Sequence, residues 1–428
     1  MVLVFFWVFL GFMALGVPIV FALGLAPAIS FILDDQSIFL KMVVQRTFAG
    51  INQFPLLAIP FFILAGEVMN RGGITVRLVD FANTLVGHLR GGLAHVNIVT
   101  SILFAGISGS AVADTSAVGS IMIPAMERDG YSRKFAAAVT AASSVIGPII
   151  PPSIIMVIYA FMMNVSVAGL FAAGMVPGLL VGFALMAVTA IISRRRNYPK
   201  AHHRAPPIEV ARSAKGAVLP LLTPIIIIGG IVGGIFTPTE AAAVAAVYAL
   251  ALSLFVLRSL KPNELANIFV NVGISSGAIL LVVGTATAFA WIATLSQLPI
   301  GLSALLFSIT DNPYILLLLL NVLLLIVGMF LDAGPAILIL GPILAPTMIQ
   351  LGIHPLHFAI IMCVNLTVGL ATPPMGLILF VASSLTRLRV EVIALEMLPF
   401  LAVEIGVILL ITYVPAISMT LPRLLGFY

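Results

Sequence analysis

Apolar runs of about 20 residues recur along the whole chain, separated by short polar or glycine- and proline-rich segments. Such a run is long enough to cross a hydrocarbon core of about 30 Å as an α-helix. Strands of a membrane barrel would instead alternate apolar and polar positions over about ten residues. The pattern predicts an all-α polytopic membrane protein with about eleven spanning helices. These are expected near residues 2–24, 52–69, 91–106, 135–162, 168–193, 217–235, 238–258, 274–297, 313–330, 356–385 and 397–421.

Two stretches mix charged and apolar residues and do not match a spanning helix. Residues 74–92 and 261–273 are typical of amphipathic helices that lie along the membrane interface, with ordinary loops as the alternative. The first apolar run has no basic segment before it and no small-residue cleavage site. It is therefore expected to be a spanning helix and not a removable signal peptide.

Composition and charge agree with a membrane protein. Of the 428 residues, 61% are hydrophobic and 8% are charged, whereas soluble domains carry about 25% charged residues. The net charge of +5 does not indicate a nucleic-acid partner, because the basic residues are concentrated in loops. Seven of the 20 Lys and Arg residues lie between Arg194 and Lys215. The positive-inside rule therefore predicts that the segment 194–216 is cytoplasmic.

The segment 194–216 separates two related halves, 1–193 and 217–428. Helix-breaking residues recur 222 positions apart, including Pro124 and Pro346, Gly130 and Gly352, Gly147 and Gly369, and the pairs at 151–152 and 373–374. The basic residues mostly do not recur: Arg133 and Lys134 correspond to Pro355 and Leu356. Lys41, near the equivalents of Arg258 and Lys261, is an exception. A charge that moves to the other end of the unit indicates an inverted repeat.

Each half contains an apolar helix interrupted by glycine and paired prolines. The interruptions are GPIIPPS at 147–153 and GLATPPM at 369–375. Proline donates no backbone hydrogen bond and blocks the carbonyl four residues earlier, so about one turn should unwind. Inside a bilayer, unwound backbone is tolerated where it is buried in protein or lines a polar cavity. Its carbonyls can bind a cation, and the new helix N-terminus can attract an anion.

A polar interruption precedes each broken helix and predicts a re-entrant hairpin. The hairpins are expected at about 104–130 and 328–352. Their tips should meet the unwound turns and bring together side-chain oxygens with backbone carbonyls. Oxygen-only ligands suit sodium, calcium or magnesium. The converging side chains are expected to be Ser108, Ser110, Asp332, Asn365 and Thr372.

Acidic residues are rare in the apolar stretches and are functional candidates by default. Asp114 and Asp332 lie at the breaks, are the favoured pair and are both expected among the sodium-binding residues. Glu240, in FTPTEAAA, is expected to cap a helix N-terminus. Glu67 and Glu404 are expected to meet a partner helix or the lipid headgroups.

Other function classes lack their essential residues. Gly106-Ile-Ser108-Gly109 resembles the nucleophile motif of rhomboid intramembrane proteases, but no histidine lies between residues 96 and 201 to activate the serine. The sequence contains neither an H-E-x-x-H metal motif nor a P-loop. A channel usually forms its pore from a ring of subunits, whereas duplicated halves with discontinuous helices are typical of secondary transporters. The chain is therefore predicted to be a transporter and not an enzyme.

Five ordered segments together identify a family resemblance. They are LLAIPFFILAGEVMN (56–70), SGSAVADTSAVGSIMIPAM (108–126), GPIIPPSIIMVIYA (147–160), GIFTPTEAAAVAAVYAL (234–250) and VGLATPPMG (368–376). The chain resembles the large membrane subunit of tripartite ATP-independent periplasmic (TRAP) transporters. The resemblance implies an elevator-type architecture in the bacterial inner membrane. It also implies sodium-driven import of an organic acid such as sialic acid, a sugar acid or a C4-dicarboxylate.

The resemblance further implies partners and sites. The partners are a periplasmic substrate-binding protein and a small membrane subunit of about four helices, expected as a separate chain, besides membrane lipid. One sodium site is implied at Ser108, Gly109 and Ser110 with Gly147 and Pro151, and a second at Asp332 with Asn365, Gly369 and Thr372. The substrate is expected between them, near Thr115, Pro152, Ser153 and Pro374. Proton coupling, a stand-alone anion transporter and an anion channel are the alternatives.

Overall fold

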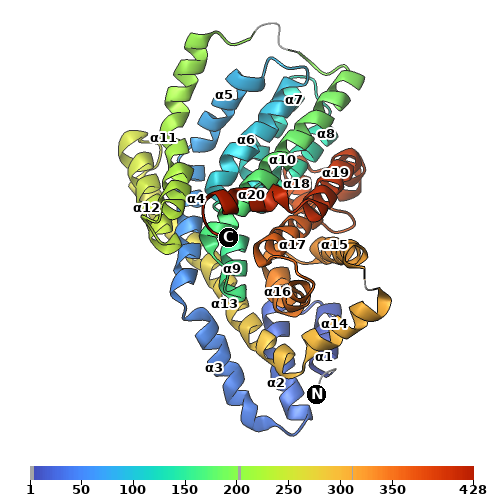
Figure 1. The fold of residues 1–428 in the computed structure, drawn as a ribbon. Helices are drawn as coiled ribbons and strands as arrows, with labels where there is room; N and C mark the ends of the chain where they lie inside the picture. The colour runs from blue at the N-terminus through green and yellow to red at the C-terminus, as the bar shows by residue number, and fades with distance from the viewer. Residues whose placement is uncertain (1–3, 201–203, 311) are drawn as a thin grey trace.

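The structure, a computed structural model, describes residues 4–200, 204–310 and 312–428, which form an assembly of packed helices (Figure 1). In the first half the α-helices are α1 (Val4–Ala14), α2 (Ile19–Leu33), α3 (Leu40–Ile51), α4 (Ala58–Arg71), α5 (Ile74–Val86), α6 (Gly92–Ser108), α7 (Ala111–Arg128), α8 (Arg133–Ser144), α9 (Ile154–Met163) and α10 (Val167–Arg195). In the second half they are α11 (Pro207–Val232), α12 (Pro238–Ala251), α13 (Leu265–Leu295), α14 (Leu298–Ile309), α15 (Pro313–Phe330), α16 (Ala333–Gln350), α17 (Pro355–Gly369), α18 (Leu377–Thr386), α19 (Val390–Tyr413) and α20 (Ala416–Leu424).

The length and apolarity of these helices confirm the all-α membrane fold. Within the described residues, 8 helical stretches are long and apolar enough to cross a membrane. Shorter apolar helices, among them α6, α9, α17 and α18, lie between them in the chain. The predicted number of about eleven spans stays a prediction, because several short helices could cross only in combination with another.

Helices recur at matching positions in the two halves. Both α7 and α16 are 18 residues long, and their first residues are 222 positions apart. The same spacing separates the first residues of α8 and α17. The peptide bonds Pro151–Pro152 and Pro373–Pro374 are both cis. The helix positions thus follow the sequence spacing, while the inverted orientation of the halves stays a prediction.

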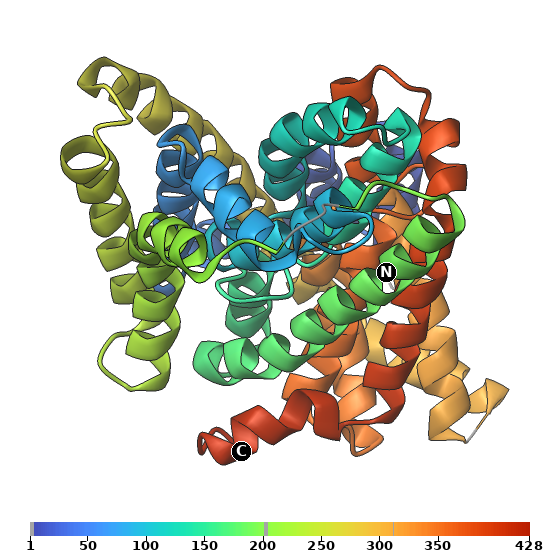
Figure 2. The ribbon, with the colours of Figure 1, turned by 90° about the horizontal axis from the view of Figure 1, so that it is seen from above.

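Two helical hairpins and two broken helices occupy the middle of the molecule. Helices α6 and α7 form one hairpin, and α15 and α16 are the arms of the other. The second arm of each hairpin packs on the broken helix of the other half, α7 on α18 and α16 on α9. Helix α13 also packs on α16 and on α2, α3 and α4. Viewed from above in Figure 2, α11 and α12 lie on one side and the helices from α15 to α19 on the other.

The first pieces of the broken helices are the most buried elements. Every residue of α8 from Phe135 to Ser144 is buried, as is every residue of α17 from Leu356 to Gly369. A helix that is covered on all sides needs small or apolar residues around its whole circumference. The run of alanines and serines in FAAAVTAASS meets this requirement. The first unwound turn, 145–153, is buried throughout, whereas the second is buried at Leu370, Ala371 and Thr372 and exposed at Pro374 and Met375.

The hairpins are longer than the sequence indicated. They were expected at about 104–130 and 328–352, but their first arms begin at Gly92 and Pro313. These first arms correspond to the runs at 91–106 and 313–330, which the hydrophobic pattern assigned to independent spans. The polar residues mark only the tip of each hairpin, and the arms resemble spanning helices because they are equally apolar.

Several helix boundaries also differ from the hydrophobic pattern. The run expected to span at 2–24 is divided into α1 and α2 by a turn that contains Gly16, at φ +74°, and Pro18; residues 2 and 3 lie outside the described residues. Of the expected interface segments, 74–92 forms α5, whereas most of 261–273 is the start of the long α13. The intrinsic helix propensity of these segments does not set where the helices begin and end, because packing against neighbouring helices can extend or end a helix.

The segment 194–216 is helical at both ends, since α10 reaches Arg195 and α11 begins at Pro207; residues 201–203 lie outside the described part of the chain.

The prediction for Glu240 is confirmed. Its carboxylate accepts hydrogen bonds from the backbone N–H and the hydroxyl of Thr237, both at 2.8 Å, which completes a capping box at the start of α12.

Candidate functional site

The tip of the first hairpin lies against the first unwound turn. Gly109 ends α6 with φ +59°, a left-handed conformation that favours glycine. A Cβ at this position would lie 2.6 Å from the carbonyl oxygen of Pro152. A Cβ on Gly147 would lie 3.2 Å from the carbonyl oxygen of Ser110. The two glycines thus allow backbone carbonyls of the tip and of the unwound turn to approach closely.

The residues predicted for the first sodium site are brought together here. Ser110 is the N-cap of α7, and its Oγ accepts a hydrogen bond from the Ala113 N–H at 3.4 Å. Behind it, the Oγ of Ser108 is buried and has no hydrogen-bond partner within the described chain. The carbonyl oxygen of Pro151 faces the same hairpin, 3.7 Å from the position of a Cβ on Gly106. An orphaned buried hydroxyl close in sequence to a tip that meets backbone carbonyls provides oxygen ligands of the kind that a hard cation prefers.

The tip of the second hairpin repeats this arrangement with a carboxylate. Asp332 is the N-cap of α16, and its Oδ1 accepts a hydrogen bond from the Ala333 N–H at 2.8 Å. The hairpin is bonded to the second unwound turn, because the Gly376 N–H donates to the carbonyl oxygen of Met329 at 3.1 Å. A Cβ on Gly369 would lie 2.6 Å from the Cα of Gly328. Glycine at these two positions lets α17 approach α15 closely.

Asn365 supplies a second orphaned oxygen. Its Nδ2 donates to Asn321 Oδ1 at 2.7 Å and to the carbonyl oxygen of Ile361 at 2.8 Å. These bonds fix the amide and leave its Oδ1, buried within the described structure, without a partner. One turn beyond the end of α17, the Thr372 hydroxyl donates to the carbonyl oxygen of Val368 at 2.8 Å, so its oxygen lone pairs stay available. Gly369 thus contacts α15 near the second tip, whereas Asn365 contacts the same arm at Asn321, eleven residues before Asp332. The oxygens of the predicted second set are of the kind that a hard cation prefers, and their convergence on one ion stays a prediction.

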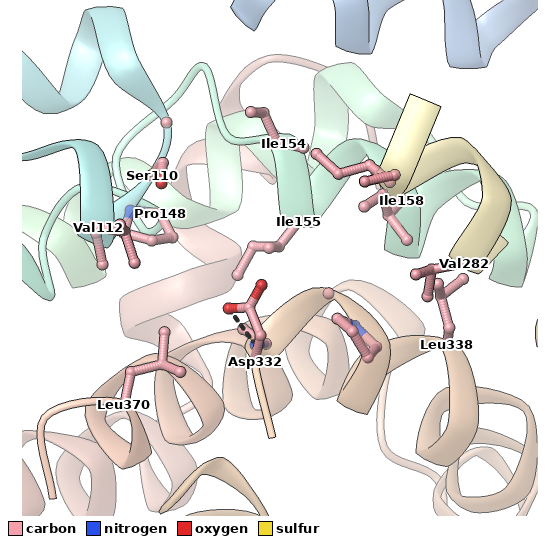
Figure 3. A pocket seen from close by; sticks show the side chains of 17 residues that line it. Ser110, Val112, Pro148, Ile154, Ile155, Ile158, Val282, Asp332, Leu338 and Leu370 are labelled. Carbon is pink, nitrogen blue, oxygen red and sulfur yellow. Dashed lines mark hydrogen bonds between the residues drawn. The ribbon is translucent and has the colours of Figure 1, made fainter. Parts of the chain in front are cut away.

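A cavity of about 400 Å³ separates the two tips (Figure 3). Figure 3 shows Asp332 at the start of α16 opposite Ile155 of the first broken helix, with Ser110 and Val112 of the first hairpin beside them. Helix α13 provides a further wall through Ala278, Ile279 and Val282. The lining is Gly109, Ser110, Ala111, Val112, Pro148, Ile154, Ile155, Ile158, Ala278, Ile279, Val282, Asp332, Ala333, Gly334, Pro335, Leu338 and Leu370.

The expected substrate residues lie beside this cavity and are not part of its described lining. Thr115 is buried, and its hydroxyl donates to the carbonyl oxygen of Ala111 in its own helix. Ser153 is the N-cap of α9, where its Oγ accepts from the Met156 N–H at 3.3 Å. Pro152 is buried and contacts Gly109, whereas Pro374 is exposed. The α13 residues were not identified from the sequence, because apolar residues in a long apolar helix give no local signal.

Asp114 belongs to a different environment from Asp332. It is fully buried one turn beyond the tip, and its Oδ2 accepts a hydrogen bond from Ser101 Oγ at 2.8 Å. Ser101 also bonds to Ser143, which donates to Asn97 Oδ1 at 3.0 Å. These contacts join α6, α7 and α8. Asp114 therefore ties the hairpin arms to the first broken helix and is not in the described lining of the cavity. Its Oδ1 is buried without a hydrogen-bond partner in the described chain, so its role as a sodium ligand stays a prediction.

The cavity offers a ligand few charged groups. Its described lining contains one carboxylate, Asp332, and no Lys, Arg or His side chain. Helices α7, α9 and α16 all begin at this cavity, and a helix N-terminus carries about half a positive charge. The described residues also contain no group of three or more His, Cys, Asp and Glu that could hold a metal ion. Oxygen ligands and helix N-termini are thus the available binding groups.

Hairpins that meet broken helices around a cavity in a polytopic membrane protein define a secondary transporter fold. The YdaH transporter of Alcanivorax borkumensis has a similar fold, with a TM-score of 0.61, 17% identity, and coverage of 92% of this chain and 89% of that chain. Residues 6–417 match the family described as the tripartite ATP-independent periplasmic transporter, DctM component. The chain belongs to this family.

Curated relatives agree with the assignment. The chain is 42% identical over 418 residues to the sialic acid TRAP transporter large permease protein SiaM of Vibrio cholerae, covering 97% of both chains. It is 42% identical over 405 residues to the C4-dicarboxylate TRAP transporter large permease protein DctM of Pseudomonas aeruginosa, covering 95% of this chain and 94% of the relative. The protein is thus a large permease subunit of the class that transports organic acids.

Proposed function

We propose that this permease couples the import of an organic acid to sodium, and that the two hairpin tips hold the sodium ions. The observation that carries the proposal is that Ser108 Oγ, beside the first tip, and Asn365 Oδ1, in the first piece of the second broken helix, are buried oxygens without a hydrogen-bond partner in the described chain. A buried polar atom without a partner costs about 1–3 kcal/mol. Bound sodium removes this cost at both positions, because a hard cation prefers oxygen ligands.

The substrate carboxylate is proposed to bind in the cavity between the tips. In the absence of a basic side chain in the described lining, an anion can be stabilised there by the N-termini of α7, α9 and α16 and by the nearby cations. An uncompensated charge at mid-membrane costs about 3 kcal/mol or more. Loaded sites therefore cross the membrane more readily than an empty or half-loaded site, which couples the two solutes.

The hairpins and broken helices are proposed to move together as a transport domain against the remaining helices. The cavity wall formed by α13 supports this division, because α13 also packs on α2, α3 and α4. Family membership supports a small membrane subunit of about four helices and a periplasmic binding protein as partners, in the bacterial inner membrane. The binding protein is proposed to deliver the acid. Uptake of sialic acid, sugar acids and C4-dicarboxylates into proteoliposomes, measured with and without the binding protein, identifies the transported acid and tests its delivery.

The coupling ion is tested by thermal unfolding of the purified chain in sodium or potassium at equal ionic strength. An ion present at ten times its dissociation constant stabilises the folded state by about 1.4 kcal/mol. The expected result is a sodium-specific rise of the midpoint that is lost in Asp332→Ala. A rise of the same size in both salts would contradict sodium binding. Uptake driven by a proton gradient alone would then favour proton coupling, and ion flux without substrate would favour a channel.

A further inference from the structure

A second cavity, of about 610 Å³, lies far from the tips, between α5 and the first turns of α11. Figures 1 and 2 show these two helices side by side, and the hydroxyls of Thr84 and Ser213 join them at 3.0 Å. We call this cavity the α5–α11 groove. Its lining is Arg77, Asp80, Asn83, Thr84, Pro206, Ile208, Glu209, Arg212, Ser213 and Gly216.

The groove contains two positive and two negative side chains, and these four form no ion pairs among the described residues. Arg77 and Asp80 come from α5, and Glu209 and Arg212 come from α11. By contrast, Arg71 and Glu67 on α4 pair at 2.7 Å. The groove therefore keeps both signs of charge available to a ligand.

The groove lies where the apolar part of a membrane helix begins. The first ten residues of α11 contain Glu209, Arg212 and Lys215, and the apolar run starts at Ala217. The same two helices carry exposed apolar side chains: Val76 and Leu85 on α5, and Ile208 and Val218 on α11. A charged centre with an apolar margin at the end of a spanning helix matches the boundary between lipid headgroups and acyl chains.

We propose that the α5–α11 groove binds the headgroup of a phospholipid that carries both a phosphate and a primary ammonium, as in phosphatidylethanolamine. The guanidinium groups of Arg77 and Arg212 can bind the phosphate through charge-assisted hydrogen bonds. The carboxylates of Asp80 and Glu209 can accept hydrogen bonds from the ammonium group. The four side chains sum to zero charge, so an anionic headgroup would leave the carboxylates uncompensated. The volume is within the range of small-ligand sites, about 300–1,000 Å³.

The test is the binding of three lipids to the delipidated full chain in detergent, measured by native mass spectrometry and by the unfolding midpoint. The lipids are phosphatidylethanolamine, phosphatidylcholine and phosphatidylglycerol with identical acyl chains. Phosphatidylcholine is the matched probe, because its quaternary ammonium cannot donate hydrogen bonds. The variants are Arg77→Ala with Arg212→Ala, Asp80→Asn with Glu209→Gln, and Arg204→Ala with Lys215→Ala as an exposed basic control outside the groove lining.

The expected result is that wild-type protein binds phosphatidylethanolamine most tightly. The arginine variant should bind every lipid about tenfold more weakly, since charge-assisted bonds to the phosphate are lost. The Asn/Gln variant should lose the preference for ethanolamine and gain affinity for phosphatidylglycerol, and the basic control should match wild type. Equal binding of the three lipids by wild type would overturn the proposal. So would a preference for phosphatidylglycerol, or an ethanolamine preference that survives in both groove variants.

Discussion

Ser110 and Asp332 hold equivalent positions, 222 residues apart, and each caps the second arm of its hairpin. The serine Oγ accepts from the Ala113 N–H at 3.4 Å, and the aspartate Oδ1 accepts from the Ala333 N–H at 2.8 Å. The two residues thus have the same structural role at the N-terminus of a helix. Only Asp332 brings a negative charge to the cavity between the tips. The natural serine at position 110 therefore indicates how the charge at position 332 can be removed without loss of the cap.

Asp332→Ser should keep the helix cap and abolish sodium coupling. The midpoint of unfolding in potassium should stay close to that of wild type, while the sodium-specific rise and sodium-driven uptake should be lost. Asp332→Ala, which also removes the cap, should cost about 1 kcal/mol more in stability. Thermal unfolding and proteoliposome uptake measure the two effects separately. Sodium dependence like that of wild type in Asp332→Ser would contradict the assignment.

Gly109→Ala should separate the first tip from the unwound turn. The added Cβ would lie 2.6 Å from the Pro152 carbonyl oxygen, and the left-handed φ of +59° disfavours alanine. Uptake should fall to background, and the sodium-specific stabilisation should weaken.

Gly229→Ala in α11 is the matched control for this substitution. A Cβ at Gly229 would have nothing within 4 Å, so transport should be unchanged. Its stability should rise by up to about 1 kcal/mol, because alanine is the better helix former. Equal activity of the two variants would show that the close approach at Gly109 is not required.

Asn321→Ala should weaken the second sodium site from outside it. Asn321 Oδ1 accepts hydrogen bonds from Asn365 Nδ2 at 2.7 Å and from Thr412 Oγ1 at 3.2 Å, so its loss leaves the Asn365 amide held only by the Ile361 carbonyl oxygen. The expected cost is about 1–3 kcal/mol of stability, together with a higher sodium concentration at half-maximal uptake. Thr412→Val removes only the second bond and should leave the sodium dependence unchanged. If both variants shift it equally, Asn321 does not orient Asn365.

Glu396→Ala should destabilise the contact between α8, α10 and α19. Its buried carboxylate pairs with Lys134 at 3.3 Å and with Arg196, which follows α10. Because both cations are about half exposed, the expected loss is about 1–2 kcal/mol, less than for a fully buried pair. Glu67→Ala breaks the exposed pair with Arg71 and should cost less than about 1 kcal/mol. Chemical or thermal unfolding of both variants tests this difference.

The sequence located the chemistry of the hairpin tips better than their structural boundaries. Glycine, serine, aspartate and proline mark a break in a membrane helix by local rules, so Gly109, Asp332 and the two proline pairs could be found in advance. The arms of the hairpins could not be distinguished from spans, because apolar residues that face protein and those that face lipid have the same composition. Likewise, nothing local in α13 indicates that Ile279 and Val282 line the cavity.

By itself, the sequence determined the membrane environment, the duplicated helix breaks and the family, because these depend on hydrophobicity, backbone chemistry and residue spacing. Tertiary structure alone decided which oxygens have partners and which do not. Ser108 and Asn365 are ordinary polar residues in the sequence; their orphaned oxygens exist because the surrounding helices exclude water while other contacts fix the amide of Asn365. It also decided that Asp114 ties helices together while Asp332 lines a cavity, since burial and partners come from segments distant in the chain.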